Sequence, residues 1–133
     1  MAGTLIVALD VDSRAEAEAI VIGPSNPVIS IGPILAVPGI REALRSAPAP
    51  VVAVSPLVRG HVLKGPTAAF MAQAGHALDS DGVVAAYDRL IDGLVADQRA
   101  SGIPTLETDV DLGTPAARRR VARETLAFAA AVR

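Results

Sequence analysis

The sequence Gly23-Pro24-Ser25-Asn26-Pro27 combines residue types that can bind a small polar ligand. Glycine lets a ligand approach the backbone closely, and the prolines stiffen the loop. The hydroxyl of Ser25 and the amide of Asn26 can hold a phosphate, a ribose or a carboxylate. The same residue types also cap helices, and a helix-like segment follows. The residues therefore leave two alternatives, a ligand-binding loop and a helix cap, and residue type alone favours the cap.

A second loop with possible binding chemistry covers residues 55–66. It contains Lys64, the only lysine in the sequence, followed by Gly65, with Arg59 and His61 nearby. A cationic amine in a glycine-rich loop suits an anionic group of a substrate, and an exposed loop lysine is the alternative. The segment is not a P-loop, because a P-loop has its lysine after the glycine and followed by Ser or Thr.

Metal binding has little support in the residue pattern. The sequence has no cysteine and only two histidines, which excludes sulfur-ligated metals and argues against a zinc site. Paired carboxylates could bind Mg²⁺, but solvated surface groups explain the pairs better. These pairs are Asp79 with Asp81, Asp88 with Asp92, and Asp109 with Asp111. The pattern therefore predicts no metal-binding residue.

Apolar strand-like runs alternate with helix-like segments along the chain. Strands are predicted at 4–11, 20–23 and 51–54, and within 92–97 and 104–110. Helices are predicted at 14–19, 31–35, 39–45 and 67–74, from a cap at Ser80, and from Thr114 to the C-terminus. This alternation predicts an α/β fold with a mainly parallel sheet flanked by helices.

The last predicted helix begins at Thr114, a capping residue that is followed by proline. Its apolar face is expected to contain Ala117, Val121, Thr125, Phe128 and Val132. Four arginines are expected on the polar face, solvated and close to Glu124: Arg118, Arg119, Arg120 and Arg123.

The two proline-bearing loops share one position in this fold. Loops 23–27 and 55–66 both begin where a predicted strand ends. Ligands of parallel α/β sheets bind at the carboxyl ends of the strands. The two loops are therefore candidates for one site.

Composition indicates one domain with an aliphatic core. Of 133 residues, 51% are hydrophobic but only 2% are aromatic, so Val, Leu, Ile and Ala must fill the core. A net charge of −2 and the scarcity of aromatic rings exclude a typical nucleic-acid binder. The first residues show neither a signal-peptide pattern nor a membrane-spanning run. We expect a single cytoplasmic α/β domain over residues 1–133, with no nucleic acid and no membrane as partner.

Four longer stretches together resemble the 2-phospho-L-lactate transferase family. They are GPSNPVISIGPILAVPGIREAL, VVAVSPLVRGHVLKGPTAAFMAQAG, DGVVAAYDRLIDGLVAD and GIPTLETDVDL. They follow the family's order and spacing from Gly23 onward. The resemblance implies a three-layer, Rossmann-like fold. It also implies transfer of a phospholactyl or phosphoenolpyruvyl group from a guanosine diphosphate-linked donor to a deazaflavin alcohol, with GMP leaving and Mg²⁺ assisting.

The resemblance also implies where the ligand binds, and it favours the ligand-loop alternative for residues 23–27. The predicted substrate or nucleotide site consists of Gly23, Ser25, Asn26, Ser55, Arg59, Lys64 and Gly65. The ligand would be a guanine nucleotide or a deazaflavin, and Mg²⁺ would be the cofactor. No catalytic residue is assigned.

The sequence departs from the family in length. Family members are more than twice as long, and this chain resembles only their C-terminal half. The other half would carry a glycine-rich first loop and the aspartates that hold magnesium, so we expect the transfer machinery to be incomplete. Residues 1–19 are predicted as an atypical N-terminal strand and helix, and residues 20–133 as the transferase-like segment.

Residues 5–17 resemble the opening strand of orotidine 5′-phosphate decarboxylase, where an aspartate at the position of Asp10 contacts the ribose. That enzyme also needs an Asp-x-Lys-x-x-Asp cluster, which Lys64 does not have around it. It is a barrel of at least about 200 residues. We therefore interpret the segment as a strand and helix that complete the sheet.

Three hypotheses follow from the sequence. The first is a domain of the transferase type that binds a guanine nucleotide or a deazaflavin. The second is a catalytically inactive α/β scaffold, from a truncated, recombined or designed chain with a junction near Ala19. The third is a subunit that pairs with a separate N-terminal half or with itself as a homodimer, completing the sheet between chains.

Overall fold

A four-stranded parallel sheet forms the centre of the computed structural model, which describes residues 18–62 and 65–132. Its strands, in spatial order, are β1 (Ile20–Ile22), β2 (Val51–Val54), β5 (Gly93–Ala96) and β6 (Thr105–Glu107). Each strand pairs in parallel with the next. All four carboxyl ends therefore lie at one edge of the sheet, as predicted for an α/β fold with a mainly parallel sheet.

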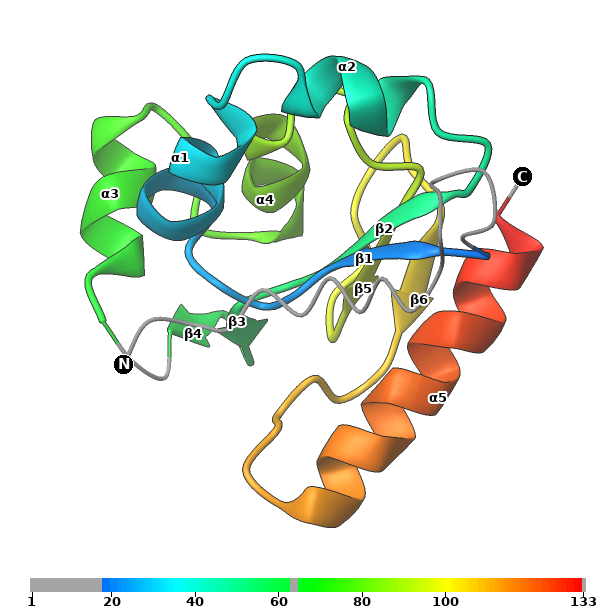
Figure 1. Cartoon of the computed structure of the whole chain (residues 1–133). Coiled ribbons are helices and arrows are strands. Elements are labelled where there is room, and N and C mark those ends of the chain that lie inside the picture. Colours follow the sequence, from blue (N-terminus) through cyan, green and yellow to red (C-terminus); the bar gives the residue numbers. More distant parts are fainter. Residues whose placement is uncertain (1–17, 63–64, 133) are drawn as a thin grey trace.

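Helices cover both faces of this sheet (Figure 1). One face packs against a short π-helix, η2 (Pro27–Ile31), and against α1 (Gly32–Leu35), α2 (Ile40–Arg45), α3 (Thr67–Gln73) and α4 (Ser80–Ala86). The long C-terminal helix α5 (Pro115–Ala131) covers the other face. The layers are helix, sheet and helix, which confirms the predicted three-layer, Rossmann-like arrangement.

The two central strands are buried on both sides because their side chains enter two separate cores. Ala53 and Leu94 contribute to the core under α3 and α4. Val54 and Val95 contribute to the core under α5. Continuous apolar sequence is typical of parallel strands that are covered on both faces. This explains why the sequence predicts β2 and β5 correctly.

A small hairpin within the second predicted loop is not anticipated by the sequence. Strand β3 (Leu57–Val58) pairs antiparallel with β4 (His61–Val62). Its turn residues have positive φ angles, 52° at Arg59 and 74° at Gly60. Two positive φ angles characterise a type I′ hairpin turn, where Asn or Gly is usual and arginine is not. Because Arg59 occupies a position where Asn or Gly is usual, the sequence gives no signal for this turn.

The cap of α4 differs from the prediction. Asp79 is the N-cap, and its Oδ1 accepts a hydrogen bond from Gly82 N at 2.8 Å. Ser80 is instead the first helical residue, and its hydroxyl donates to Gln98 O at 2.7 Å. The helix also ends at Ala86, so Asp88 and Asp92 do not share a helix face.

The start of α5 is as predicted. Thr114 caps the helix, and its hydroxyl oxygen accepts from Ala117 N at 3.1 Å. Val121 and Thr125 are buried on the sheet-facing side. The strand predicted at 4–11 and residues 14–17 of the helix predicted at 14–19 lie outside the described residues, and the helix does not extend to Glu18 and Ala19, which precede β1 without helical structure. Among the helices of the described ranges, none combines the length and apolarity that crossing a bilayer requires.

Candidate functional site

A glycine or a polar residue follows each of the four parallel strands at the carboxyl-end edge of the sheet. Gly23 follows β1, Ser55 follows β2, Asp97 follows β5 and Thr108 follows β6. Strands β1 and β2 are direct neighbours. The structure therefore brings the starts of both predicted loops to adjacent strand ends.

The first loop is a helix cap. Asn26 Oδ1 accepts hydrogen bonds from Val28 N at 2.9 Å and from Ile29 N at 3.2 Å, which caps η2. A further bond from Ser25 N to Gly23 O, at 2.8 Å, closes the turn before it. Three backbone N–H groups thus fix the conformation of residues 23–29.

Capping uses only one end of the Asn26 amide. Its Nδ2 is buried and has no hydrogen-bond partner among the described residues. A buried amide without an acceptor costs free energy, so an acceptor that reached this atom would stabilise the folded state. The cap and ligand-loop alternatives are therefore compatible, because the cap orients the amide and leaves a donor for a ligand.

Ser55 connects β2 to the hairpin. It is buried, its N–H donates to Val95 O at 2.8 Å, and its hydroxyl oxygen accepts from Leu57 N at 3.1 Å. These bonds direct the chain from the sheet into β3. The visible role of Ser55 is to shape the turn.

The tip of the hairpin is tied to the next strand. Arg59 N donates to Asp97 Oδ2 at 2.5 Å. This bond holds Arg59 in its left-handed conformation beside the end of β5. Gly65 is exposed with a φ of 78°, and Lys64 lies outside the described residues.

A hollow of about 350 Å³ opens at this edge, and its lining is Arg59, Asp97, Glu107, Thr108 and Asp109. Its volume is at the small end of the range for ligand sites. Arg59 is the only lining residue that also belongs to the predicted ligand-binding set. Asp109 is a candidate only as half of a carboxylate pair, and Asp97 and Thr108 are not singled out, because both lie within the segments 92–97 and 104–110 that are predicted to contain strands.

The described residues do not provide a magnesium site. No group of three His, Asp or Glu side chains among them is arranged to hold a metal ion. Several carboxylates bind backbone instead: Asp109 accepts from Asp111 N and Asp111 from Gly113 N, each at 2.9 Å. We therefore derive no step through a metal ion.

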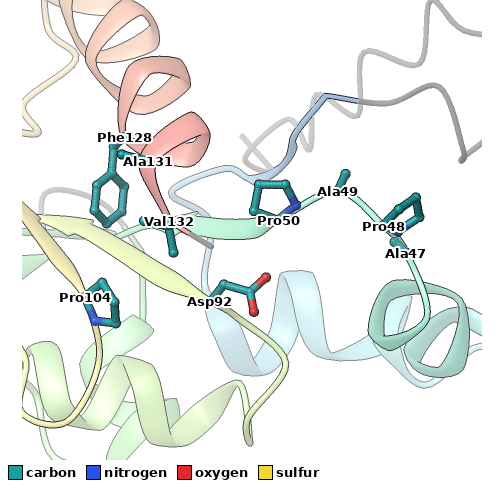
Figure 2. Close-up of a pocket in the computed structure, with 9 residues that line it drawn as sticks. All are labelled: Ala47, Pro48, Ala49, Pro50, Asp92, Pro104, Phe128, Ala131 and Val132. Atoms are coloured by element: carbon teal, nitrogen blue, oxygen red, sulfur yellow. The ribbon is translucent and has the colours of Figure 1, made fainter.

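The opposite edge of the sheet has a hollow of a different kind (Figure 2). Its volume is about 570 Å³, and it is lined by Ala47, Pro48, Ala49, Pro50, Asp92, Pro104, Phe128, Ala131 and Val132. Its single charged side chain, Asp92, accepts a hydrogen bond from Val51 N at 2.7 Å. None of the predicted site residues lies there.

Tyr87 is a titratable residue that lies in the core and lines neither hollow. Burial raises the pKa of its hydroxyl, which has no hydrogen-bond partner among the described residues. The side chain is therefore neutral and contributes to packing, together with Met71 and Leu94.

Comparison with known proteins gives one consistent family. A family model for 2-phospho-L-lactate transferase CofD matches residues 10–126. The 2-phospho-L-lactate transferase of Halobacterium salinarum is 50% identical over 107 residues, which cover 78% of this chain and 31% of that protein. The phosphoenolpyruvate transferase of Kitasatospora aureofaciens is 42% identical over 137 residues, covering 92% and 41% respectively.

The chain spans between 31% and 41% of the length of these two relatives. The family match begins before Gly23, runs across Ala19 and overlaps the segment that resembles the decarboxylase. The match thus includes residues 10–19 of the N-terminal segment. Because the match covers most of the sequence, the chain belongs to the 2-phospho-L-lactate transferase CofD family.

Proposed function

We propose that this chain is the ligand-binding part of a phospholactyl or phosphoenolpyruvyl transferase of deazaflavin coenzyme biosynthesis. Its ligand is a guanosine diphosphate-linked donor or the deazaflavin. Family membership supports the class of reaction. The observation that carries the location is the buried Asn26 amide, which is fixed by capping and retains a donor at the carboxyl end of β1.

The ligand would bind at the carboxyl-end edge of the sheet, and the seven predicted residues are the first candidates for contacting it. Group transfer from a diphosphate depends mainly on positioning and on stabilisation of negative charge. Arg59 and Lys64 supply cationic groups, and Asn26 supplies an amide donor. The transfer step itself is not assigned to these residues.

Thermal unfolding of the purified chain with GDP or a deazaflavin alcohol tests this proposal. A ligand specific for the folded state at a hundred times its Kd adds about 2.7 kcal/mol to the free energy of unfolding, so the melting temperature must rise. Each ligand is measured with and without Mg²⁺, because the resemblance implies that ion, and ADP is the matched nucleotide control. No shift at millimolar GDP or deazaflavin would instead support the inactive-scaffold hypothesis.

We also propose that the chain pairs with a second copy of itself. Strands β1 and β6 are the outermost strands of the described sheet, and an outermost strand can pair with a strand of another chain. Sedimentation equilibrium should give the mass of a dimer. The mass of a monomer at every concentration would overturn self-pairing and leave the binding proposal standing.

A further inference from the structure

We infer that Arg120, on α5, is a positioning residue that holds one wall of the carboxyl-end hollow in the geometry a ligand requires. This inference rests on the proposed binding function and adds a residue to it. The guanidinium of Arg120 forms hydrogen bonds with Thr108 and Glu124 and with the backbone of Asp109. Thr108 and Asp109 both line the hollow.

The first part of this arrangement is a closed triangle of side chains. Arg120 Nη1 donates to Thr108 Oγ1 at 2.8 Å and to Glu124 Oε2 at 3.1 Å. The Thr108 hydroxyl in turn donates to Glu124 Oε2 at 2.6 Å. The hydroxyl thus donates one bond and accepts one, which fixes its rotamer. Bonds that involve ionised groups are stronger than neutral ones.

The second part fixes the backbone that follows β6. Arg120 Nη2 donates to Asp109 O at 2.6 Å. On the other side of the segment, Thr108 N donates to Ala96 O at 2.9 Å. The Thr108–Asp109 wall is therefore held from two directions, by β5 through its backbone and by α5 through Arg120.

The four arginines of α5 differ in their surroundings, which corrects the expectation that all four are solvated. Arg120 is half-buried, and Arg118 Nε donates to Leu112 O at 2.9 Å. Two arginines thus bind backbone carbonyls of the segment between β6 and α5. Arg119 and Arg123 are exposed, and neither has a partner among the described residues. They provide matched controls on the same helix.

The test compares Arg120→Met with Arg119→Met in the full chain. Two quantities are measured: the Kd for GDP by calorimetry, and the hydrogen-exchange rates of the Asp111 and Gly113 amides, whose acceptors are Asp109 and Asp111. Arg120→Met should weaken GDP binding about tenfold, because the ligand must then order the Thr108–Asp109 wall itself. It should also speed exchange of both amides. Arg119→Met should change neither quantity.

A second pair of variants separates positioning from general destabilisation. Thr108→Ser keeps the hydroxyl in the triangle and should bind GDP like the wild type. Thr108→Val removes the hydroxyl at nearly the same volume and should weaken binding several-fold. This pair also decides the matter if Arg120→Met does not fold.

The outcomes distinguish this inference from the proposed function. Wild-type affinity in folded Arg120→Met or in Thr108→Val would overturn the positioning role and leave the proposed function intact. Failure of the wild type to bind millimolar GDP would overturn nucleotide binding. In that case the exchange rates alone test whether Arg120 holds the Thr108–Asp109 wall. Unchanged exchange rates in Arg120→Met would overturn that role as well.

Discussion

The two edges of the central sheet differ in chemistry although the same strands form both. At the carboxyl-end edge, the side chains of Asn26 and Ser55 accept hydrogen bonds from backbone N–H groups that follow them in the chain, and Asp97 accepts one from Arg59 N in the turn between β3 and β4. At the amino-end edge, prolines and aliphatic side chains surround the C-terminal end of α5 (Figure 2). One edge therefore has polar groups held in fixed orientations, and the other has a hollow whose lining is apolar except for Asp92.

Backbone hydrogen bonding explains much of this difference. Strands that begin at the amino-end edge present N–H groups that need acceptors, and proline has no N–H. Pro50 and Pro104 directly precede β2 and β6, and Asp92 provides the acceptor for Val51 N. This edge meets its own hydrogen-bonding requirements. We therefore expect substitutions there to change stability, and substitutions at the other edge to change ligand affinity.

The largest effect is expected from Phe128→Ala at the amino-end edge. The half-buried ring packs over Gly93 so closely that a Cβ atom added to this glycine would lie 2.7 Å from Phe128 Cε1. Losing the ring should lower the free energy of unfolding by about 3 kcal/mol without altering GDP affinity. Urea unfolding measures the first quantity, and exposed Leu126→Ala on the same helix is the control. Equal stability of the two variants would show that the packing of Phe128 over Gly93 does not stabilise the fold.

Asp92→Ala should have the next largest effect. It removes the acceptor of the buried Val51 N–H, which should cost about 1–2 kcal/mol of unfolding free energy. Asp92→Asn retains an oxygen at the same place and should lose much less. The comparison between edges would fail if Asp92→Ala weakened GDP binding and left stability unchanged.

Asn26→Asp sharpens the comparison at the carboxyl-end edge. Aspartate keeps the capping oxygen but replaces the Nδ2 donor by an acceptor, so GDP affinity should fall about tenfold while the cap of η2 is retained. Asn26→Ala removes both functions and should also cost about 1 kcal/mol of stability. Calorimetry and urea unfolding on the two variants check this. Unchanged affinity in both would mean that the ligand does not contact Asn26.

A small stability change of opposite sign is expected from Arg59→Asn. Asparagine tolerates positive φ and is usual in type I′ turns, so the variant should gain up to about 0.5 kcal/mol of unfolding free energy. Its GDP affinity should nevertheless fall several-fold, because the cationic side chain is lost. A thermal melt with and without GDP shows whether the two quantities change in opposite directions.

The sequence predicts the fold better than the candidate site, because the fold depends more on contacts between residues that are close in the sequence. Strands β2 and β5 and the Thr114 cap are encoded by contiguous residues, so local patterns identify them. The β3–β4 hairpin is missed because each strand has two residues and its turn contains Arg59 in a conformation unusual for arginine.

The sequence predicts only part of the candidate site, because the lining of the carboxyl-end hollow comes from distant segments. The rule that ligands bind at strand ends selects loops 23–27 and 55–66, and the structure brings the first residues of both loops to adjacent strand ends. The rule gives no indication that Asp97 binds Arg59 N or that Arg120 holds Thr108 and Asp109, since these contacts join residues from different elements. The amphipathic pattern of α5 predicts the same solvated environment for its four arginines. The structure shows that they differ in their hydrogen-bond partners.

Chemical-shift mapping of backbone amides during titration with GDP tests the central claim most directly. We predict that the largest shifts occur at Gly23, Asn26, Arg59, Thr108 and Asp109, while Ala49, Phe128 and Val132 at the other edge stay unchanged. Largest shifts at the amino-end edge, or no shifts at millimolar GDP, would contradict the assignment of binding to the carboxyl ends of the strands.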